Sequence, residues 1–181
     1  MEKSFYKKTI QLSKETAFIL LTVVGAVVLP QIFHVIGAWC GVGGKLGQIF
    51  LPMYIPILII GVYRGWASGA IAGLLAPLIS FALTQMPSSA LLPFITLELT
   101  VTGLFAGVFA KCKMPVVLRI FSVQVLAKAV RLIAFAISLY IANGTVSASA
   151  LFSGVLASIP GVLLQLVLLT LLIVKKEKQN A

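Results

Sequence analysis

Six apolar segments, each near the length needed to cross a bilayer, follow one another along the chain and constrain its fold more than any other feature. A membrane-spanning helix takes about 20 predominantly apolar residues. The 181-residue chain is 60% hydrophobic and only 10% charged, which is too apolar for a soluble domain of this length. The sequence therefore predicts an all-α integral membrane protein, a single domain over residues 1–181, with spans at about 17–38, 50–63, 66–84, 91–110, 116–141 and 151–174.

The basic residues indicate how these segments are oriented. Of the 14 Lys and Arg residues, eleven fall on one side if both termini share that side, and only Lys45 falls in a loop on the other side. Cytoplasmic loops of membrane proteins carry an excess of Lys and Arg. We therefore expect both termini in the cytoplasm. The net charge of +10 then reflects topology, and no nucleic-acid partner is expected.

Two further features fit this topology. Cys40 and Cys112 would lie on opposite faces of the membrane, so we expect no disulfide between them. The basic N-terminus precedes an apolar run that is too long for the central region of a signal peptide. We interpret that run as a retained first span.

Three ionisable residues, Glu98, Lys128 and Arg131, lie inside segments that otherwise predict membrane helix. A charge at bilayer depth costs ~2.5 to 3.5 kcal/mol on insertion scales, so such residues are rare and usually mark a substrate or ion site. At 1.5 Å per residue, Glu98 would lie ~12 Å and Arg131 ~15 Å below the outer ends of their segments. Their matched depths predict that these three residues, the charged trio, lie close together.

Gln124, Lys128 and Arg131 are spaced i, i+4, i+7 and share one helix face. One interpretation is a structural ion pair that ties the fourth segment to the fifth. The other is a polar cavity open to the outside, whose charge of +1 suits a ligand with a carboxylate or phosphate. The residues on adjoining turns that could line such a cavity are Phe94, Thr102 and Phe135.

Two more polar residues lie inside apolar segments. His34, near the outer end of the first segment, is either a further ligand contact or a hydrogen-bonding residue at the membrane interface. Gln165, in the sixth segment, could face Gln124 or a neighbouring helix.

Small residues recur at four-residue spacing in the third and fourth segments, as in the pairs Gly69 and Gly73, and Gly103 and Gly107. Such faces let helix backbones approach closely. They favour either packing inside the bundle or docking of another membrane protein.

The motifs of several enzyme classes are missing from the sequence. The loop GVGGKLG has Trp39 where a phosphate-binding loop needs its first glycine and Leu46 where it needs Ser or Thr. We interpret this glycine-rich loop as a flexible lid. No His, Cys, Asp and Glu cluster has metal-ligand spacing, and no nucleophile motif such as G-x-S-x-G occurs. We expect no metal, no cofactor and no catalytic activity.

Residues 49–111 resemble the substrate-binding S components of energy-coupling factor (ECF) vitamin transporters. The resemblance is carried by LPMYIPILIIGVYRGWASGAIAGLLAPLISFALTQMP and by LPFITLELTVTGLFAGVFAK. It implies a six-helix bundle in a prokaryotic plasma membrane that captures a vitamin from outside in a pocket lidded by the first loop.

The resemblance also implies partners. Members of this family dock on a membrane coupling protein that carries two ATPases. Their docking pattern in the first span is Ala-x-x-x-Ala, and this chain departs from it with Thr22 and Ala26 and with Gly25 between them. Together with Gly69 and Gly73, these are the candidate docking residues, and membrane lipid surrounds the rest of the bundle.

The charge of the trio favours an anionic vitamin, with pantothenate as the first choice. The resemblance leaves open pyridoxine or pyridoxamine, hydroxymethylpyrimidine, folate, cobalamin and queuosine precursors. The alternative class of function is a self-sufficient small secondary transporter or channel, in which Glu98 would carry the ion coupling.

Overall fold

The computed structural model describes residues 2–41, 49–141 and 158–179, with side chains for 11–41, 49–140 and 158–175. In these residues the chain is all helical and forms no strand. The helices are α1 (Glu2–Trp39), α3 (Tyr54–Arg64), α4 (Trp66–Thr84), α5 (Leu92–Phe109), α6 (Val116–Ile141) and α8 (Ile159–Gln179). The expected all-α class is therefore confirmed for the described residues.

Four of these helices are long and apolar enough to cross a membrane: the part of α1 from Gln11 to Trp39, α4, α5, and α6 from Val116 to Tyr140. The apolar parts of α3 (Tyr54–Arg64) and of α8 (Ile159–Lys175) are shorter. A multi-pass membrane protein is thus supported by length and composition, and the count of six spans stays a prediction.

The expected boundaries agree with the structure for the segments at 66–84 and 116–141, and to within two residues for 91–110. The first helix is longer than expected and begins at Glu2, because residues 2–16 contain no Gly or Pro to end it. The expected sixth span began at 151, and its first seven residues lie outside the described part. The expected lid, residues 42–48, also lies outside it.

The second segment differs most from its expected course. Its main helix, α3, begins only at Tyr54, because Leu51 has a left-handed φ of +48° and Pro52 has no backbone N–H. The carbonyl of Leu51 accepts a hydrogen bond from the backbone N–H of Tyr54 at 3.1 Å and so forms the turn that starts the helix. With 11 residues, α3 is ~16 Å long, about half of a bilayer core.

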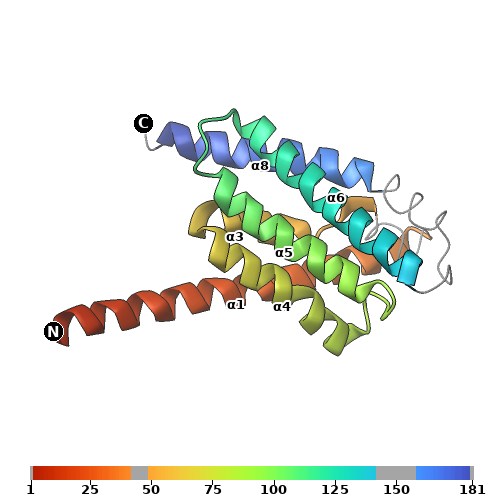
Figure 1. The fold of residues 1–181 in the computed structure, drawn as a ribbon, viewed down its shortest axis with the longest axis horizontal. Coiled ribbons are helices and arrows are strands. Elements are labelled where there is room, and N and C mark those ends of the chain that lie inside the picture. Colours follow the sequence, from red (N-terminus) through yellow and green to blue (C-terminus); the bar gives the residue numbers. More distant parts are fainter. Residues whose placement is uncertain (1, 42–48, 142–157, 180–181) are drawn as a thin grey trace.

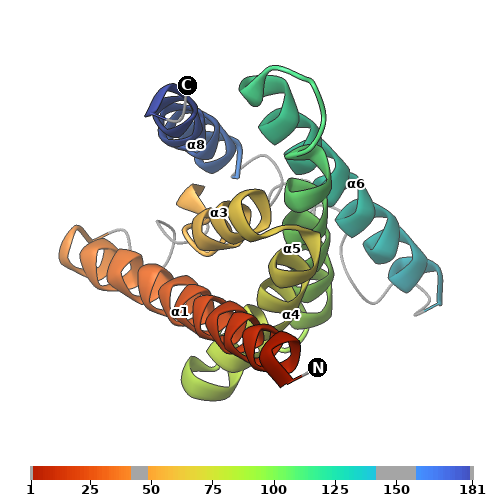
Figure 2. The ribbon, with the colours of Figure 1, turned by 90° about the vertical axis from the view of Figure 1, so that its left-hand side faces the viewer.

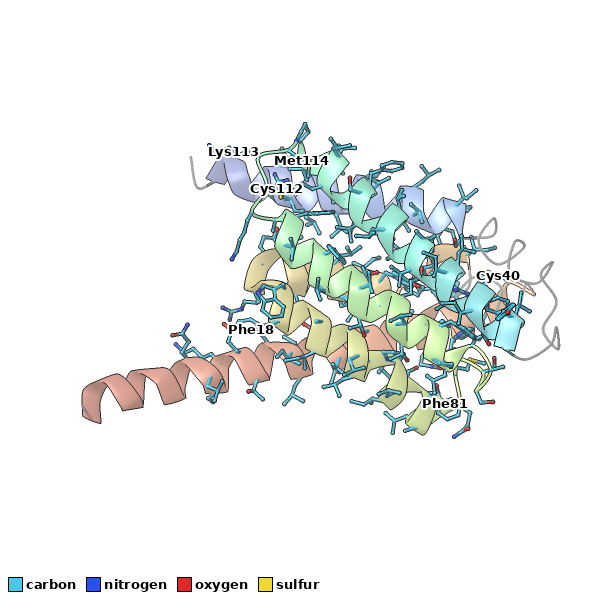
Figure 3. All side chains as sticks on the ribbon, in the orientation of Figure 1. Phe18, Cys40, Phe81, Cys112, Lys113 and Met114 are labelled. Atoms are coloured by element: carbon cyan, nitrogen blue, oxygen red, sulfur yellow. The ribbon has the colours of Figure 1, made fainter. Side chains whose placement is uncertain are left out.

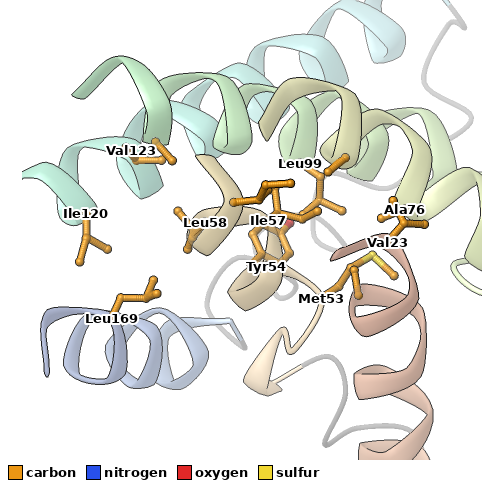
Figure 4. Close-up of a cluster of buried hydrophobic side chains, with 14 of the residues drawn as sticks. Val23, Met53, Tyr54, Ile57, Leu58, Ala76, Leu99, Ile120, Val123 and Leu169 are labelled. Carbon is orange, nitrogen blue, oxygen red and sulfur yellow. The ribbon is translucent and has the colours of Figure 1, made fainter. Parts of the chain in front are cut away.

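This short helix lies at the centre of the bundle. Viewed from the end, α3 is surrounded by α1, α4, α5, α6 and α8 (Figure 2), and it packs against α1, α4, α5 and α8. Its contribution to the hydrophobic core includes Tyr54, Ile57 and Leu58. The surrounding helices contribute, among others, Val23, Ala76, Leu99, Ile120, Val123 and Leu169 (Figure 4).

The two termini lie at the same end of the bundle, and α1 projects beyond the other helices there (Figure 1). An ionic cluster fixes α1 to the turn between α3 and α4 at this end. Arg64 Nη1 lies 3.3 Å from Glu15 Oε1, and its guanidinium lies 3.7 Å from the centroid of the Phe18 ring. Ser68 Oγ donates a hydrogen bond to Glu15 Oε2 at 3.4 Å.

The outward faces of the bundle are apolar, and side chains project from them on all visible sides (Figure 3). Leu21 on α1 is 69% exposed, Ile133 on α6 is 59% exposed and Val167 on α8 is 61% exposed. A soluble monomer rarely exposes contiguous apolar surface on this scale. Lipid chains would cover it, which agrees with the membrane environment that the helix lengths indicate.

Glycines bring α4 and α5 into backbone contact. A Cβ added at Gly69 would lie 2.2 Å from the carbonyl oxygen of Gly103, and one added at Gly73 would lie 2.3 Å from that of Leu99. Both glycines are buried. Of the two interpretations of these small-residue faces, the structure favours packing inside the bundle.

Candidate ligand-binding site

The structure brings the charged trio together between α5 and α6. Lys128 Nζ donates to Glu98 Oε1 at 2.9 Å, and Arg131 Nη1 donates to Glu98 Oε2 at 2.8 Å. The two cations are three residues apart and so lie on the same face of α6, which packs against α5. Each oxygen of the carboxylate therefore has its own cation.

Burial differs between the carboxylate and its partners. The Glu98 side chain is fully buried, whereas those of Lys128 and Arg131 keep 15% and 14% exposure. An ammonium carries three donors and a guanidinium five, and Glu98 accepts one hydrogen bond from each group. Within the described residues, the cluster has a net charge of +1 and further donors on its cationic side that Glu98 does not use, which suits a small anion.

Tyr54, at the start of α3, belongs to this cluster and was not among the residues expected from the sequence. Its ring centroid lies 5.5 Å from Lys128 Nζ, within the range of a cation–π interaction. The residue is 3% exposed. Its hydroxyl has Glu98 and Arg131 as charged neighbours, yet it makes no hydrogen bond of normal geometry.

A signal for Tyr54 does exist in the sequence. Tyrosines of membrane helices gather at the interfaces, where the hydroxyl reaches water. A tyrosine that is buried needs a polar partner inside the bundle. The sequence does not show which face of the second segment (residues 50–63) meets the fifth segment (residues 116–141). Lys128 could therefore not be predicted as a neighbour of Tyr54.

A second polar contact continues the same face of α6 towards α8. Gln124 Nε2 donates to Gln165 Oε1, and Gln165 Nε2 donates to the carbonyl of Leu51 at 3.1 Å. Both glutamines are buried. Of the two positions considered for Gln165, the structure shows the one that faces Gln124.

The three expected lining residues divide in role. The rings of Phe94 and Phe135 lie 5.0 Å apart between centroids and join α5 to α6 near the trio. Thr102 is buried, and its hydroxyl donates to the backbone carbonyl of Glu98 at 2.7 Å. The Thr102 hydroxyl thus uses its donor inside α5, so it is less suited to hold a ligand than its position in the sequence suggested.

His34 lies apart from the trio. It is half-exposed and belongs to α1, which packs against α3 and α4. In the part of the chain that the structure describes, no hydrogen bond or ion pair joins it to the charged residues of α5 and α6. The structure therefore does not bring His34 into this cluster.

The candidate docking residues are also divided. Ala26 is fully buried, and Gly69 and Gly73 face α5, so these three lie inside the bundle. Thr22 and Gly25 remain half-exposed on α1, and the Thr22 hydroxyl donates to the carbonyl of Phe18 at 2.8 Å. Of the five candidate docking residues, Thr22 and Gly25 are the two that offer surface to a partner.

A small cavity lies near the turn between α5 and α6, where Phe109, Ala110 and Val116 are part of its lining. Its volume is about 20 Å³, room for roughly one water, and its lining is apolar except for Arg119. It is too small for a ligand. Among the described residues, no three His, Cys, Asp or Glu side chains converge as metal ligands would.

Comparisons of the chain with protein-family models, with curated proteins and with solved structures find no match. The function of the chain is therefore inferred from the geometry of the charged trio and its neighbours.

Proposed function

We propose that this chain is a substrate-binding S component of an ECF-type vitamin importer, embedded in the plasma membrane of a prokaryote. The observation that carries the proposal is the cluster of Glu98, Lys128 and Arg131, which holds two cations and one carboxylate inside an otherwise apolar helical bundle. Intramembrane charges are costly and are usually kept for a substrate or ion.

The site would work as an anion receptor. Glu98 holds the two cations in place and offsets part of their charge, because each of its oxygens accepts one hydrogen bond. The remaining donors of Lys128 and Arg131 would then bind the carboxylate or phosphate of a ligand. Charge-assisted hydrogen bonds of this kind are shorter and stronger than neutral ones.

The proposed topology has six spans and both termini in the cytoplasm. Two observations support this topology. The two termini lie at the same end of the bundle (Figure 1), and most of the Lys and Arg residues fall on the side of the membrane that the termini would share. α3 would occupy the position of the second span, and the helices around it would shield it from lipid. In this orientation the ligand reaches the trio from outside.

Pantothenate is the proposed first substrate, because it carries a carboxylate that suits the +1 cluster. The other vitamins of the family remain alternatives, those with an acidic group first. Transport would require a membrane coupling protein and two ATPases, since the sequence has no phosphate-binding loop of its own.

The competing proposal is a self-sufficient secondary transporter in which Glu98 couples transport to ions. The test is reconstitution of the purified chain alone into liposomes with an imposed proton or sodium gradient. We expect the purified chain to bind pantothenate, and the proteoliposomes to show no uphill uptake of it. Accumulation driven by either gradient would favour the secondary transporter, and a chain that does not bind pantothenate would reject the proposed substrate.

A further inference from the structure

Two fully buried polar atoms near the charged trio make no hydrogen bond of normal geometry with any residue that the structure describes. They are the hydroxyl of Tyr54 on α3 and Oε1 of Gln124 on α6. Their residues are 3% and 1% exposed. Buried polar groups are nearly always paired, because an unpaired one loses its hydration and gains nothing in return. Two such atoms beside one ionic cluster therefore indicate that a ligand bound at the cluster would form hydrogen bonds with both.

The orientation of the Gln124 amide follows from its neighbours. The carbonyl of Leu51 can only accept, so the nitrogen of Gln165 must point to it, at 3.1 Å. Gln165 then presents its oxygen to the nitrogen of Gln124. What remains on Gln124 is an acceptor, Oε1, and it can be satisfied only by a group that donates a hydrogen.

The Tyr54 hydroxyl has the complementary chemistry. It can donate, and its charged neighbours are Glu98 and Arg131. Its ring is held by the core residues around it (Figure 4) and by the ammonium of Lys128, 5.5 Å from the ring centroid. An anion bound to Lys128 and Arg131 would offer this hydroxyl an acceptor.

We propose that the Tyr54 hydroxyl and Gln124 Oε1 are two further contacts of the ligand-binding site, and that together they select an anion that also carries a hydroxyl or amide N–H. Gln124 and Lys128 are four residues apart on α6, which corresponds to ~6 Å along the helix. The donor group of the ligand would therefore lie about one helical turn from its charge. This inference rests on the proposed function and narrows its substrate class.

The test measures pantothenate binding to the full chain in detergent. Pantothenate carries a carboxylate together with an amide N–H and hydroxyls. Tyr54→Phe should weaken its binding about tenfold, the value of one buried hydrogen bond. The melting temperature of the ligand-free protein should fall little, because the hydroxyl makes no hydrogen bond of normal geometry with its charged neighbours Glu98 and Arg131. Heptanoate, a carboxylate without such donors, should bind the wild-type chain at least tenfold more weakly than pantothenate.

Thr170→Val is the matched control. Thr170 Oγ1 is another buried hydroxyl without a partner, but it lies on α8, five residues beyond Gln165 towards the C-terminal end. This variant removes the same kind of group and should bind pantothenate as the wild type does. Arg131→Ala serves as the reference for loss of the site.

The outcomes separate the inference from the proposed function. If Tyr54→Phe binds pantothenate within twofold of wild type while Arg131→Ala does not bind it, the two contacts are rejected and the anion site stands. Equal affinity for heptanoate and pantothenate would likewise reject the proposed substrate class. If the wild-type chain binds neither compound, the inference falls together with pantothenate as the proposed substrate.

Discussion

At the scale of single residues, the position of Glu98 between Lys128 and Arg131 allows two roles that differ in what they predict. A buried ion pair can serve as a structural strut, and the cost of desolvating its charges makes it weak evidence for stability. It can also present spare donors to a ligand. The two cations keep partial exposure and the carboxylate has none, which is the arrangement expected of a receptor for an anion.

Arg131→Ala should weaken pantothenate binding by roughly 30-fold or more. Removing one member of a buried, hydrogen-bonded charge pair costs ~2 to 5 kcal/mol, and 1.4 kcal/mol corresponds to about tenfold in affinity. Binding titration and thermal melting are measured on the same purified variant. A large fall in melting temperature with unchanged affinity would identify the cluster as a strut.

The double variant Glu98→Gln, Arg131→Gln supplies the control for that experiment. It removes both charges of the Arg131–Glu98 pair and leaves Lys128, which also pairs with Glu98, as the one charge of the cluster. We expect it to be less stable than Arg131→Ala, in which Glu98 stays paired with Lys128, and also unable to bind pantothenate. Recovered binding would place the anion contact elsewhere.

At the scale of the helices, the contact between α4 and α5 depends on glycine. Gly69→Ala would place a methyl group 2.2 Å from the carbonyl oxygen of Gly103, and backbone atoms cannot rotate away as a side chain can. The two helices would have to separate. We expect a loss of ~1 to 3 kcal/mol, the usual cost of overpacking, seen as a lower melting temperature in detergent.

Gly25→Ala is the comparison for Gly69→Ala. At Gly25 the nearest atom to an added Cβ is Pro56 Cγ at 3.8 Å, an ordinary van der Waals distance. This variant should melt at or above the temperature of the wild type. If both variants melted alike, close packing of α4 on α5 would not be what stabilises the bundle.

At the scale of the whole molecule, the two cysteines report the orientation in the membrane. Cys40 and Cys112 lie at opposite ends of the bundle (Figure 3), and both are free thiols. Because Lys and Arg gather at the end that holds Cys112, we expect that end in the cytoplasm. An impermeant maleimide applied to intact cells should label Cys40 and reach Cys112 only after permeabilisation.

The single variants Cys40→Ser and Cys112→Ser assign the label to one thiol. Labelling of Cys112 from outside, with Cys40 protected, would invert the proposed topology. It would also contradict the proposed uptake from outside.

The sequence by itself determined the helical class, the ends of α4 and α6, and the meeting of Glu98 with Lys128 and Arg131. Those features depend on local or one-dimensional properties: the length of apolar runs, the Gly and Pro that end them, and the depth of a charge below the end of its segment. An unpaired charge at bilayer depth is so costly that opposite charges at matched depths are expected to form ion pairs.

Only the tertiary structure decided that α3 is central, that Tyr54 and Gln165 join the polar face of α6, and that Gly69 and Gly73 pack inside the bundle. A helix that is apolar all round carries no periodic pattern to show which face meets a neighbour and which meets lipid. The left-handed turn at Leu51, which starts α3 and receives the amide of Gln165, likewise depends on contacts distant in sequence. The rotation of each helix about its axis is therefore set by tertiary packing. That rotation decides that Tyr54 and Gln165 lie beside the polar face of α6.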